Sequence, residues 1–216
     1  MTRTGLRLLV FVLFTWTLCF VVLQHLGTWI PFAFVGLVLT IFAVSRRVVP
    51  RSLLQPSLAR TTVGIAGGAL MVVGTHLAYR AIVTFAPQVA GATRQLLVLL
   101  NVAGFSPVVR ALLIVLIASC EEVLFRGLLP TSATPGSSLP HRPSMRQLAQ
   151  TVAFAAVYAF TTLPLGSALL LLCAFACGSL WGLMRIATGS LVVPLLAHVV
   201  WDLGVLLVWP LAAQLP

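Results

Sequence analysis

Seven apolar runs, each near the length of a membrane-spanning helix, constrain this chain more than any other feature. A bilayer core needs about 20 predominantly apolar residues per helix, and 60% of the 216 residues are hydrophobic whereas only 7% are charged. We therefore predict an all-α, polytopic membrane helix bundle that forms a single domain over residues 1–216. The predicted spans are residues 6–26, 29–45, 61–85, 107–129, 146–163, 165–186 and 190–209.

The segments between these runs carry signals for helix ends. The sequence "GFSP" offers Ser106 as an N-cap and Pro107 at the first helical position. A short interfacial or re-entrant helix is expected over 95–104, and a polar loop over 130–143. The five tryptophans are expected to be interface anchors or packing residues.

The positive charge comes from thirteen arginines and no lysine, and its distribution predicts the orientation of the bundle. With a cytoplasmic N-terminus, the alternating spans place ten arginines at or near the cytoplasmic face and three, Arg80, Arg94 and Arg110, on the other side. Cytoplasmic segments of membrane proteins carry such an excess of positive residues. We therefore predict a cytoplasmic N-terminus and a multi-pass location in a cell membrane, and expect this to be the bacterial cytoplasmic membrane.

The net charge of +10 would suggest nucleic-acid binding in a soluble protein. Here the arginines lie at the ends of apolar runs, where they act as topology signals. Nucleic acid is therefore excluded as a partner, and the lipid bilayer is the expected environment.

The three acidic residues of the chain, Glu121, Glu122 and Asp202, all fall inside predicted spans. An ionisable group in a bilayer costs at least about 2.5 kcal/mol at a helix centre, so such residues face the bundle interior and are candidate functional groups. Glu122 and Arg126 are four residues apart and should form an ion pair on one helix face. Glu121 points about 100° away around the helix, so we predict that it is the free carboxylate.

The sequence "HVVWD" in the last span places His198 and Asp202 four residues apart, again on one helix face. In the predicted topology, Glu121 and His198 lie in the same half of the membrane. A carboxylate beside an imidazole suits the activation of water by general acid and base catalysis. The alternative is a purely structural role, in which these buried polar residues only fix the packing of the helices.

These two motifs resemble those of a known family. "EEVLFRG" is similar to the EExxxR motif, and "HVVWD" to the HxxxN/D motif, of the CPBP family of intramembrane proteases (CAAX protease and bacteriocin-processing, also called ABI). The resemblance covers about residues 107–209, and it implies that this part is the catalytic core. Residues 1–106 would then form accessory N-terminal helices.

The resemblance also implies roles for individual residues. Glu121 would activate the hydrolytic water, and Glu122 with Arg126 would brace the site. His198 with Asp202 would stabilise the oxyanion or orient the water, and loss of such a donor commonly costs about 2.7–4 kcal/mol of transition-state stabilisation.

One position departs from the family pattern. The family usually carries FxxxH in the helix between these motifs, and the counterpart here is "FAAVY", with Phe154 in register and Tyr158 in place of the histidine. Tyrosine is neutral at pH 7, so Tyr158 could donate a hydrogen bond but is a poor base and an unsuitable zinc ligand. A weakly active or inactive relative is therefore an open alternative.

A catalytic zinc usually has three protein ligands, and the sequence offers only Glu121, His198 and, as a third, Asp202. We therefore predict a glutamate-based mechanism with no cofactor, with a zinc enzyme as the less favoured reading.

The family resemblance implies a membrane-associated peptide or protein as the substrate. Prenylated CAAX tails, bacteriocin precursors and C-terminal anchoring segments all fit, and no residue selects among them. Two alternatives are a non-catalytic membrane scaffold and, less favoured, a proton-coupled transporter. The transporter is less favoured because the sequence lacks a repeated half that contains a second charged helix broken by Gly or Pro.

Overall fold

The computed structural model describes residues 3–100, 105–129 and 143–211, and every regular element in these ranges is a helix. The predicted all-α fold is therefore confirmed. The longer helices are α1 (Arg3–Leu26), α2 (Ile30–Ser45), α3 (Leu58–Phe85), α4 (Gln88–Leu100), α5 (Pro107–Glu121), α6 (Met145–Phe160), α7 (Ala168–Thr188) and α8 (Val192–Leu203). The short helical segments are η1 (Arg51–Leu54), η2 (Glu122–Arg126), η3 (Leu163–Leu165) and η4 (Gly204–Val208).

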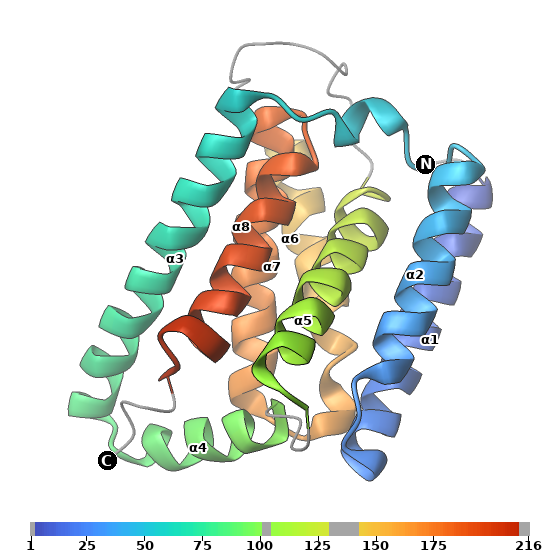
Figure 1. The fold of residues 1–216 in the computed structure, drawn as a ribbon. Coiled ribbons are helices and arrows are strands. Elements are labelled where there is room, and N and C mark those ends of the chain that lie inside the picture. Colours follow the sequence, from blue (N-terminus) through green and yellow to red (C-terminus); the bar gives the residue numbers. More distant parts are fainter. Residues whose placement is uncertain (1–2, 101–104, 130–142, 212–216) are drawn as a thin grey trace.

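The long helices run back and forth between the two ends of one bundle, while α4 lies across one end (Figure 1). Helix α1 begins at one end of the bundle, and α8 runs from that end toward the other. Among the described residues, α1, α3 and α7 are long and apolar enough to cross a membrane, and α2 and Val192–Val208 are shorter apolar helices. The membrane helix bundle agrees with the prediction, whereas the count of seven spans and the cytoplasmic N-terminus stay predictions.

The ends of most helices lie close to the predicted positions. Ser106 is the N-cap of α5, where its side chain accepts a hydrogen bond from the backbone N–H of Val109 at 3.4 Å. The main difference is α4, which begins at Gln88 and not at residue 95. Residues 101–104 of that predicted helix and 130–142 of the predicted polar loop lie outside the described residues.

Helices α3 and α8 pack closely because small residues on α3 face the backbone of α8. A Cβ atom on Gly64 would lie 2.9 Å from the carbonyl oxygen of Val193, and one on Gly68 would lie 2.7 Å from that of Ala197. Small residues four apart allow such close approach between membrane helices. This contact fixes the helix that carries His198.

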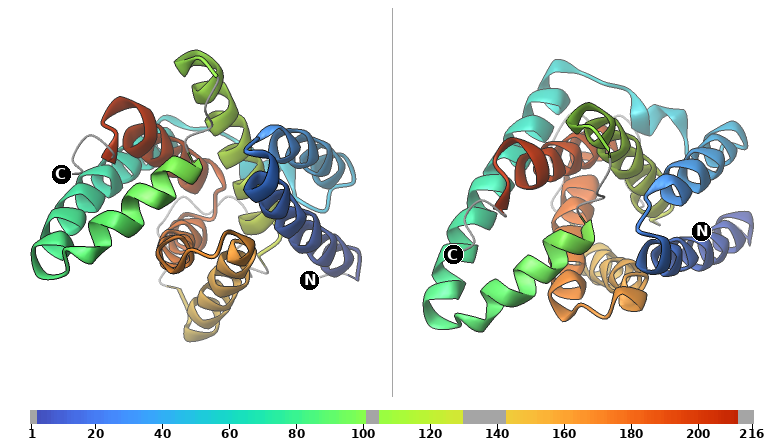
Figure 2. Two further views of the ribbon diagram at one scale, coloured as in Figure 1. Left: turned by 90° about the horizontal axis from the view of Figure 1, so that it is seen from below. Right: turned by 60° about the horizontal axis from the view of Figure 1, so that its bottom comes forward.

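Helix α5 lies between α2 on one side and α8 on the other (Figure 2). Large apolar side chains also cover the outside of the bundle, including Phe14, Phe34 and Leu70, each about two-thirds exposed or more. Apolar side chains on the outside fit a lipid environment, so polar groups are expected to gather inside. The neighbouring positions of α5 and α8 bring the two sequence motifs together there.

Candidate active site

The two glutamates lie where α5 changes into η2, a turn of π-helix. In this turn the backbone N–H of Gly127 donates to the carbonyl oxygen of Glu122, five residues earlier, at 3.1 Å. Such wider turns inside helices occur frequently at functional sites. Glu121, Glu122 and Arg126 are all buried.

Glu122 is held by two basic side chains. Its Oε1 lies 3.2 Å from Nη1 of Arg126, so the predicted ion pair is present. The same oxygen lies 2.9 Å from Nδ1 of His198, a contact that the sequence did not indicate. Because an ionised carboxylate only accepts hydrogen bonds, Nδ1 is the donor in this pair.

Glu121 is held by two neutral donors, and the prediction of a free carboxylate is wrong in that respect. Nε1 of Trp16 donates to Oε1 at 2.8 Å, and the hydroxyl of Tyr158 donates to Oε2 at 2.9 Å. Buried polar groups need such partners, because an unpaired one costs free energy. Oε2 also faces Nε2 of His198 at 3.7 Å.

His198 is the centre of the arrangement. Its Nδ1 faces Glu122, while its Nε2 faces both Glu121 and Oδ2 of Asp202, the latter at 3.4 Å. The imidazole stacks on the indole ring of Trp181, with 3.6 Å between ring centroids. The ring therefore has a fixed plane and three carboxylates around its two nitrogens.

Tyr158 occupies the position where the family pattern has histidine, and it faces the predicted base. Its ring forms a T-shaped contact with Phe125, with 4.9 Å between centroids, and the guanidinium carbon of Arg126 lies 4.6 Å from its centroid. A Cβ atom on Gly178 of α7 would lie 3.2 Å from the ring. These contacts hold the hydroxyl against Glu121.

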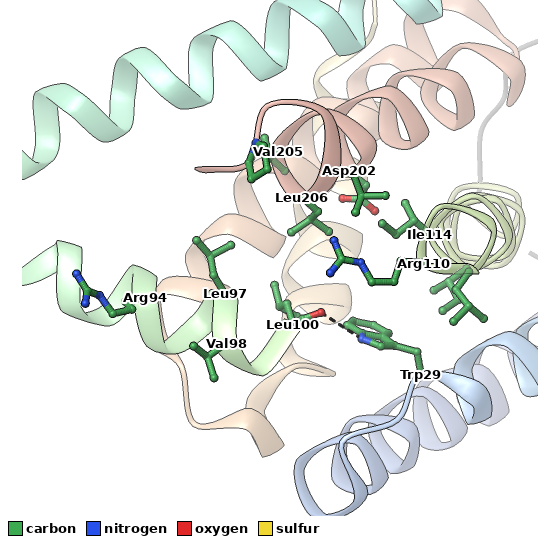
Figure 3. A pocket seen from close by; sticks show the side chains of 14 residues that line it. Trp29, Arg94, Leu97, Val98, Leu100, Arg110, Ile114, Asp202, Val205 and Leu206 are labelled. Carbon is green, nitrogen blue, oxygen red and sulfur yellow. Dashed lines mark hydrogen bonds between the residues drawn. The ribbon is translucent and has the colours of Figure 1, made fainter. Parts of the chain in front are cut away.

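A cavity of about 380 Å³ adjoins this arrangement at Asp202 (Figure 3). Its wall is mostly apolar and comes from α4, α5 and the end of α8 with η4. The charged side chains in the wall are Arg94, Arg110 and Asp202, and Arg110 and Asp202 point into the same space. Nε1 of Trp29 donates to the carbonyl oxygen of Leu100 at 3.3 Å on one side of the cavity. The cavity therefore combines an apolar wall with a carboxylate that also contacts His198.

A comparison with protein families assigns the segment that carries these residues. Residues 103–204 match the family model described as type II CAAX prenyl endopeptidase Rce1-like. We call this matched segment, which is just under half of the chain, the CAAX protease segment. The resemblance read from the two motifs is thus confirmed, and comparisons with curated proteins and with solved structures found no match.

The CAAX protease segment contains every predicted site residue: Glu121, Glu122, Arg126, Tyr158, His198 and Asp202. The structure brings all six together around the imidazole of His198. Their catalytic roles stay predictions.

The sequence did not indicate that Trp16 takes part in this arrangement. The tryptophans were expected to be anchors or packing residues, and Trp16 is a fully buried packing residue whose N–H also donates to a carboxylate. It lies in α1, outside the CAAX protease segment. No motif or helical spacing links it to Glu121, so a sequence signal for this contact was lacking.

A catalytic zinc ion would have to bind the same carboxylates and His198. In the part of the chain that the structure describes, no three His, Cys, Asp or Glu side chains are grouped so that they could hold a metal ion. Two of the nearest groups already have other partners, since Trp16 and Tyr158 donate to Glu121 and Nδ1 of His198 contacts Glu122. The choice between a glutamate-based and a zinc-based mechanism stays a prediction.

Proposed function

We propose that this protein is an intramembrane endopeptidase that hydrolyses a peptide bond of a membrane-associated substrate with a water activated by Glu121. The single observation that carries the proposal is the 3.7 Å distance between Oε2 of Glu121 and Nε2 of His198. One water molecule can contact two groups at this separation. Both groups are buried and lie in the CAAX protease segment, which supports a hydrolytic role.

In the proposed reaction, Glu121 takes a proton from the water while the water oxygen attacks the carbonyl carbon of the peptide bond. The carbonyl oxygen becomes an oxyanion, which the N–H at Nε2 of His198 stabilises. When the tetrahedral intermediate collapses, the C–N bond breaks and the proton on Glu121 moves to the leaving nitrogen. The products are a carboxylic acid and an amine, so atoms and charge balance.

The other residues act through His198 in this proposal. Glu122, held by Arg126, fixes the ring through Nδ1. Asp202 lies on the opposite side, at 3.4 Å from Nε2. Because an ionised carboxylate cannot donate a hydrogen bond, Asp202 orients the imidazole and does not itself bind the oxyanion.

We infer that the segment of substrate next to the scissile bond binds in the cavity beside Asp202. Its volume of about 380 Å³ and apolar wall support this, because ligand pockets are typically mostly apolar with volumes of about 300 to 1,000 Å³. The substitution Ile114→Trp, in the wall, should raise KM several-fold. The matched control is Leu112→Trp on the same helix, because Leu112 is 65% exposed on the outside.

The proposed setting is a seven-span bundle in a bacterial cytoplasmic membrane with its N-terminus in the cytoplasm. The positions of the arginines support this orientation. Reporter tags on the two termini of the full chain would test it, with opposite sides expected.

The decisive experiment is cleavage of a library of membrane-anchored C-terminal segments by purified protein in lipid. Wild type should cleave members of the library, and Glu121→Gln should lower kcat by about 10²- to 10⁴-fold, the usual contribution of a general base. Tyr158→His restores the family's usual residue and should raise turnover. Retained cleavage by Glu121→Gln would contradict the proposal, and a chelator should leave the wild-type rate unchanged.

One observation favours a second candidate function, a catalytically weak or inactive membrane scaffold. Both oxygens of Glu121 accept hydrogen bonds from protein donors, and one donor is the tyrosine that replaces histidine. This candidate predicts that Glu121→Ala leaves the cellular phenotype intact, whereas the protease predicts its loss.

A further inference from the structure

Helix α1 precedes the CAAX protease segment in the chain, yet it contacts the proposed catalytic base directly. Nε1 of Trp16 donates to Oε1 of Glu121 at 2.8 Å, and 105 residues separate the two positions. The Trp16 side chain has no solvent exposure. The indole therefore forms one wall of the site from outside the part of the chain that defines the family.

The position of this indole is fixed from three sides. Its ring forms T-shaped contacts with Phe32 in α2, with 5.3 Å between centroids, and with Phe125 in η2, with 6.0 Å. A Cβ atom on Gly36 would lie 3.1 Å from the far edge of the indole, so this position of α2 leaves room for nothing larger than glycine without a shift. The N–H thus has one available direction, toward Glu121.

Trp16 and Tyr158 hold opposite oxygens of the same carboxylate. Two fixed donors on opposite oxygens define the plane of the carboxylate, because rotation about its last bond would break both hydrogen bonds. This plane turns Oε2 toward Nε2 of His198. An indole N–H donates and cannot accept, so Trp16 does not compete with Glu121 for a proton of the water.

We infer that Trp16 is a positioning residue that orients Glu121 for water activation, so that α1 is part of the catalytic structure and not an accessory helix. This inference rests on the proposed function of Glu121. It assigns a role in the site to a residue outside residues 103–204.

The first test is Trp16→Phe, which keeps an aromatic ring against Phe32 and Phe125 but removes the N–H. Loss of a hydrogen bond to a charged group should lower kcat by about ten- to a hundredfold. KM should stay within about twofold, because Trp16 does not line the cavity proposed for the substrate. A kcat equal to that of wild type would overturn the inference.

A second variant separates the N–H from the shape of the side chain. Incorporation of β-(3-benzothienyl)alanine at position 16 replaces the N–H with sulfur and keeps the fused ring. It should lower kcat as Trp16→Phe does, with an unchanged melting temperature. If only Trp16→Phe loses activity, packing explains the loss and the inference is wrong.

The matched control concerns another buried indole hydrogen bond. Nε1 of Trp201 donates to the side-chain oxygen of Thr75 in α3, also at 2.8 Å. Thr75→Val removes this acceptor and should leave kcat unchanged. An equal loss of kcat in Thr75→Val would show a general effect of indole hydrogen bonds on the bundle and would overturn the inference.

A measurement without substrate separates this inference from the proposed function. In ¹⁵N-indole NMR spectra of the protein in detergent, Glu121→Gln should shift the N–H resonance of Trp16 much more than that of Trp201. A shift confined to Trp16 in a protein that cleaves no library member would refute the proposed function and retain the contact. A Trp16 resonance that does not respond would overturn the inference, whatever the activity.

Discussion

Glu121 and Glu122 are neighbours in the chain, yet side chains of different charge hold them. Glu122 is completely buried between two basic side chains, Arg126 and His198. Glu121 accepts its two hydrogen bonds from neutral donors, the indole of Trp16 and the hydroxyl of Tyr158. The π-helical turn that follows α5 lets adjacent residues reach these two environments.

This difference explains how one segment can provide both a structural carboxylate, Glu122, and a proposed catalytic base, Glu121. Cations beside Glu122 balance its charge, so this carboxylate is suited to holding Arg126 and His198 in place. Neutral donors fix the direction of the Glu121 carboxylate, and the imidazole of His198 lies farther from it, at 3.7 Å, than from Glu122, at 2.9 Å. We therefore propose Glu121, and not Glu122, as the base, and substitutions at the two positions should have different effects.

The largest expected effect is the contrast between Glu121→Gln and Glu122→Gln. Glu122→Gln leaves the buried Arg126 without a carboxylate partner, and it should lower the free energy of unfolding by about 3–5 kcal/mol. Glu121→Gln should change the free energy of unfolding by much less, and it should abolish most activity. Denaturant titration in detergent, together with the cleavage rate, would measure both effects, and equal losses of stability would contradict the comparison.

A double substitution sharpens the same contrast. If Glu122 and Arg126 stabilise the bundle as a pair, Glu122→Gln combined with Arg126→Gln should cost less than the sum of the two single changes. Additive losses would show that the two side chains act independently.

A smaller effect is expected for Tyr158→Phe, which removes one neutral donor from Glu121 and keeps the ring contacts. The rate constant kcat should fall by about tenfold, the size expected for one hydrogen bond to a charged group. The matched control is Tyr79→Phe on α3, since Tyr79 is the other tyrosine of the chain and is also buried. If Tyr158→Phe is as active as the control, the hydroxyl has no part in orienting Glu121.

The smallest effect is expected for Asp202→Asn. The amide oxygen of asparagine can still accept a hydrogen bond from Nε2 of His198, so kcat/KM should fall by only about three- to fivefold. Asp202→Ala removes the acceptor and should cost more. Equal losses for the two variants would show that the charge of Asp202, and not its hydrogen bond, matters.

The sequence predicted what depends on local spacing. Apolar runs gave the positions of α1 to α3 and α5 to α8 within a few residues, and the four-residue spacing of Glu122 and Arg126 gave their ion pair. The start of α4 was missed because its first residues, "QVAGATR", lack an apolar run.

The contacts that the sequence did not predict join residues far apart in the chain. Nδ1 of His198 contacts Glu122 across 76 positions, and Trp16 contacts Glu121 across 105. Such contacts depend on which helices become neighbours, and apolar periodicity does not determine that. Because a buried carboxylate needs hydrogen-bond partners, some donors to Glu121 could be expected from the sequence. The sequence did not indicate which residues these donors would be.

In the proposed mechanism, Glu121 and His198 hold one water molecule between α5 and α8. An experimental structure of the full chain in a lipid nanodisc, at a resolution that shows ordered water, would test it most directly. We expect one water within hydrogen-bond distance of both Oε2 of Glu121 and Nε2 of His198. Side chains too far apart for one water to bridge, or a Glu121 carboxylate that faces the lipid, would contradict it.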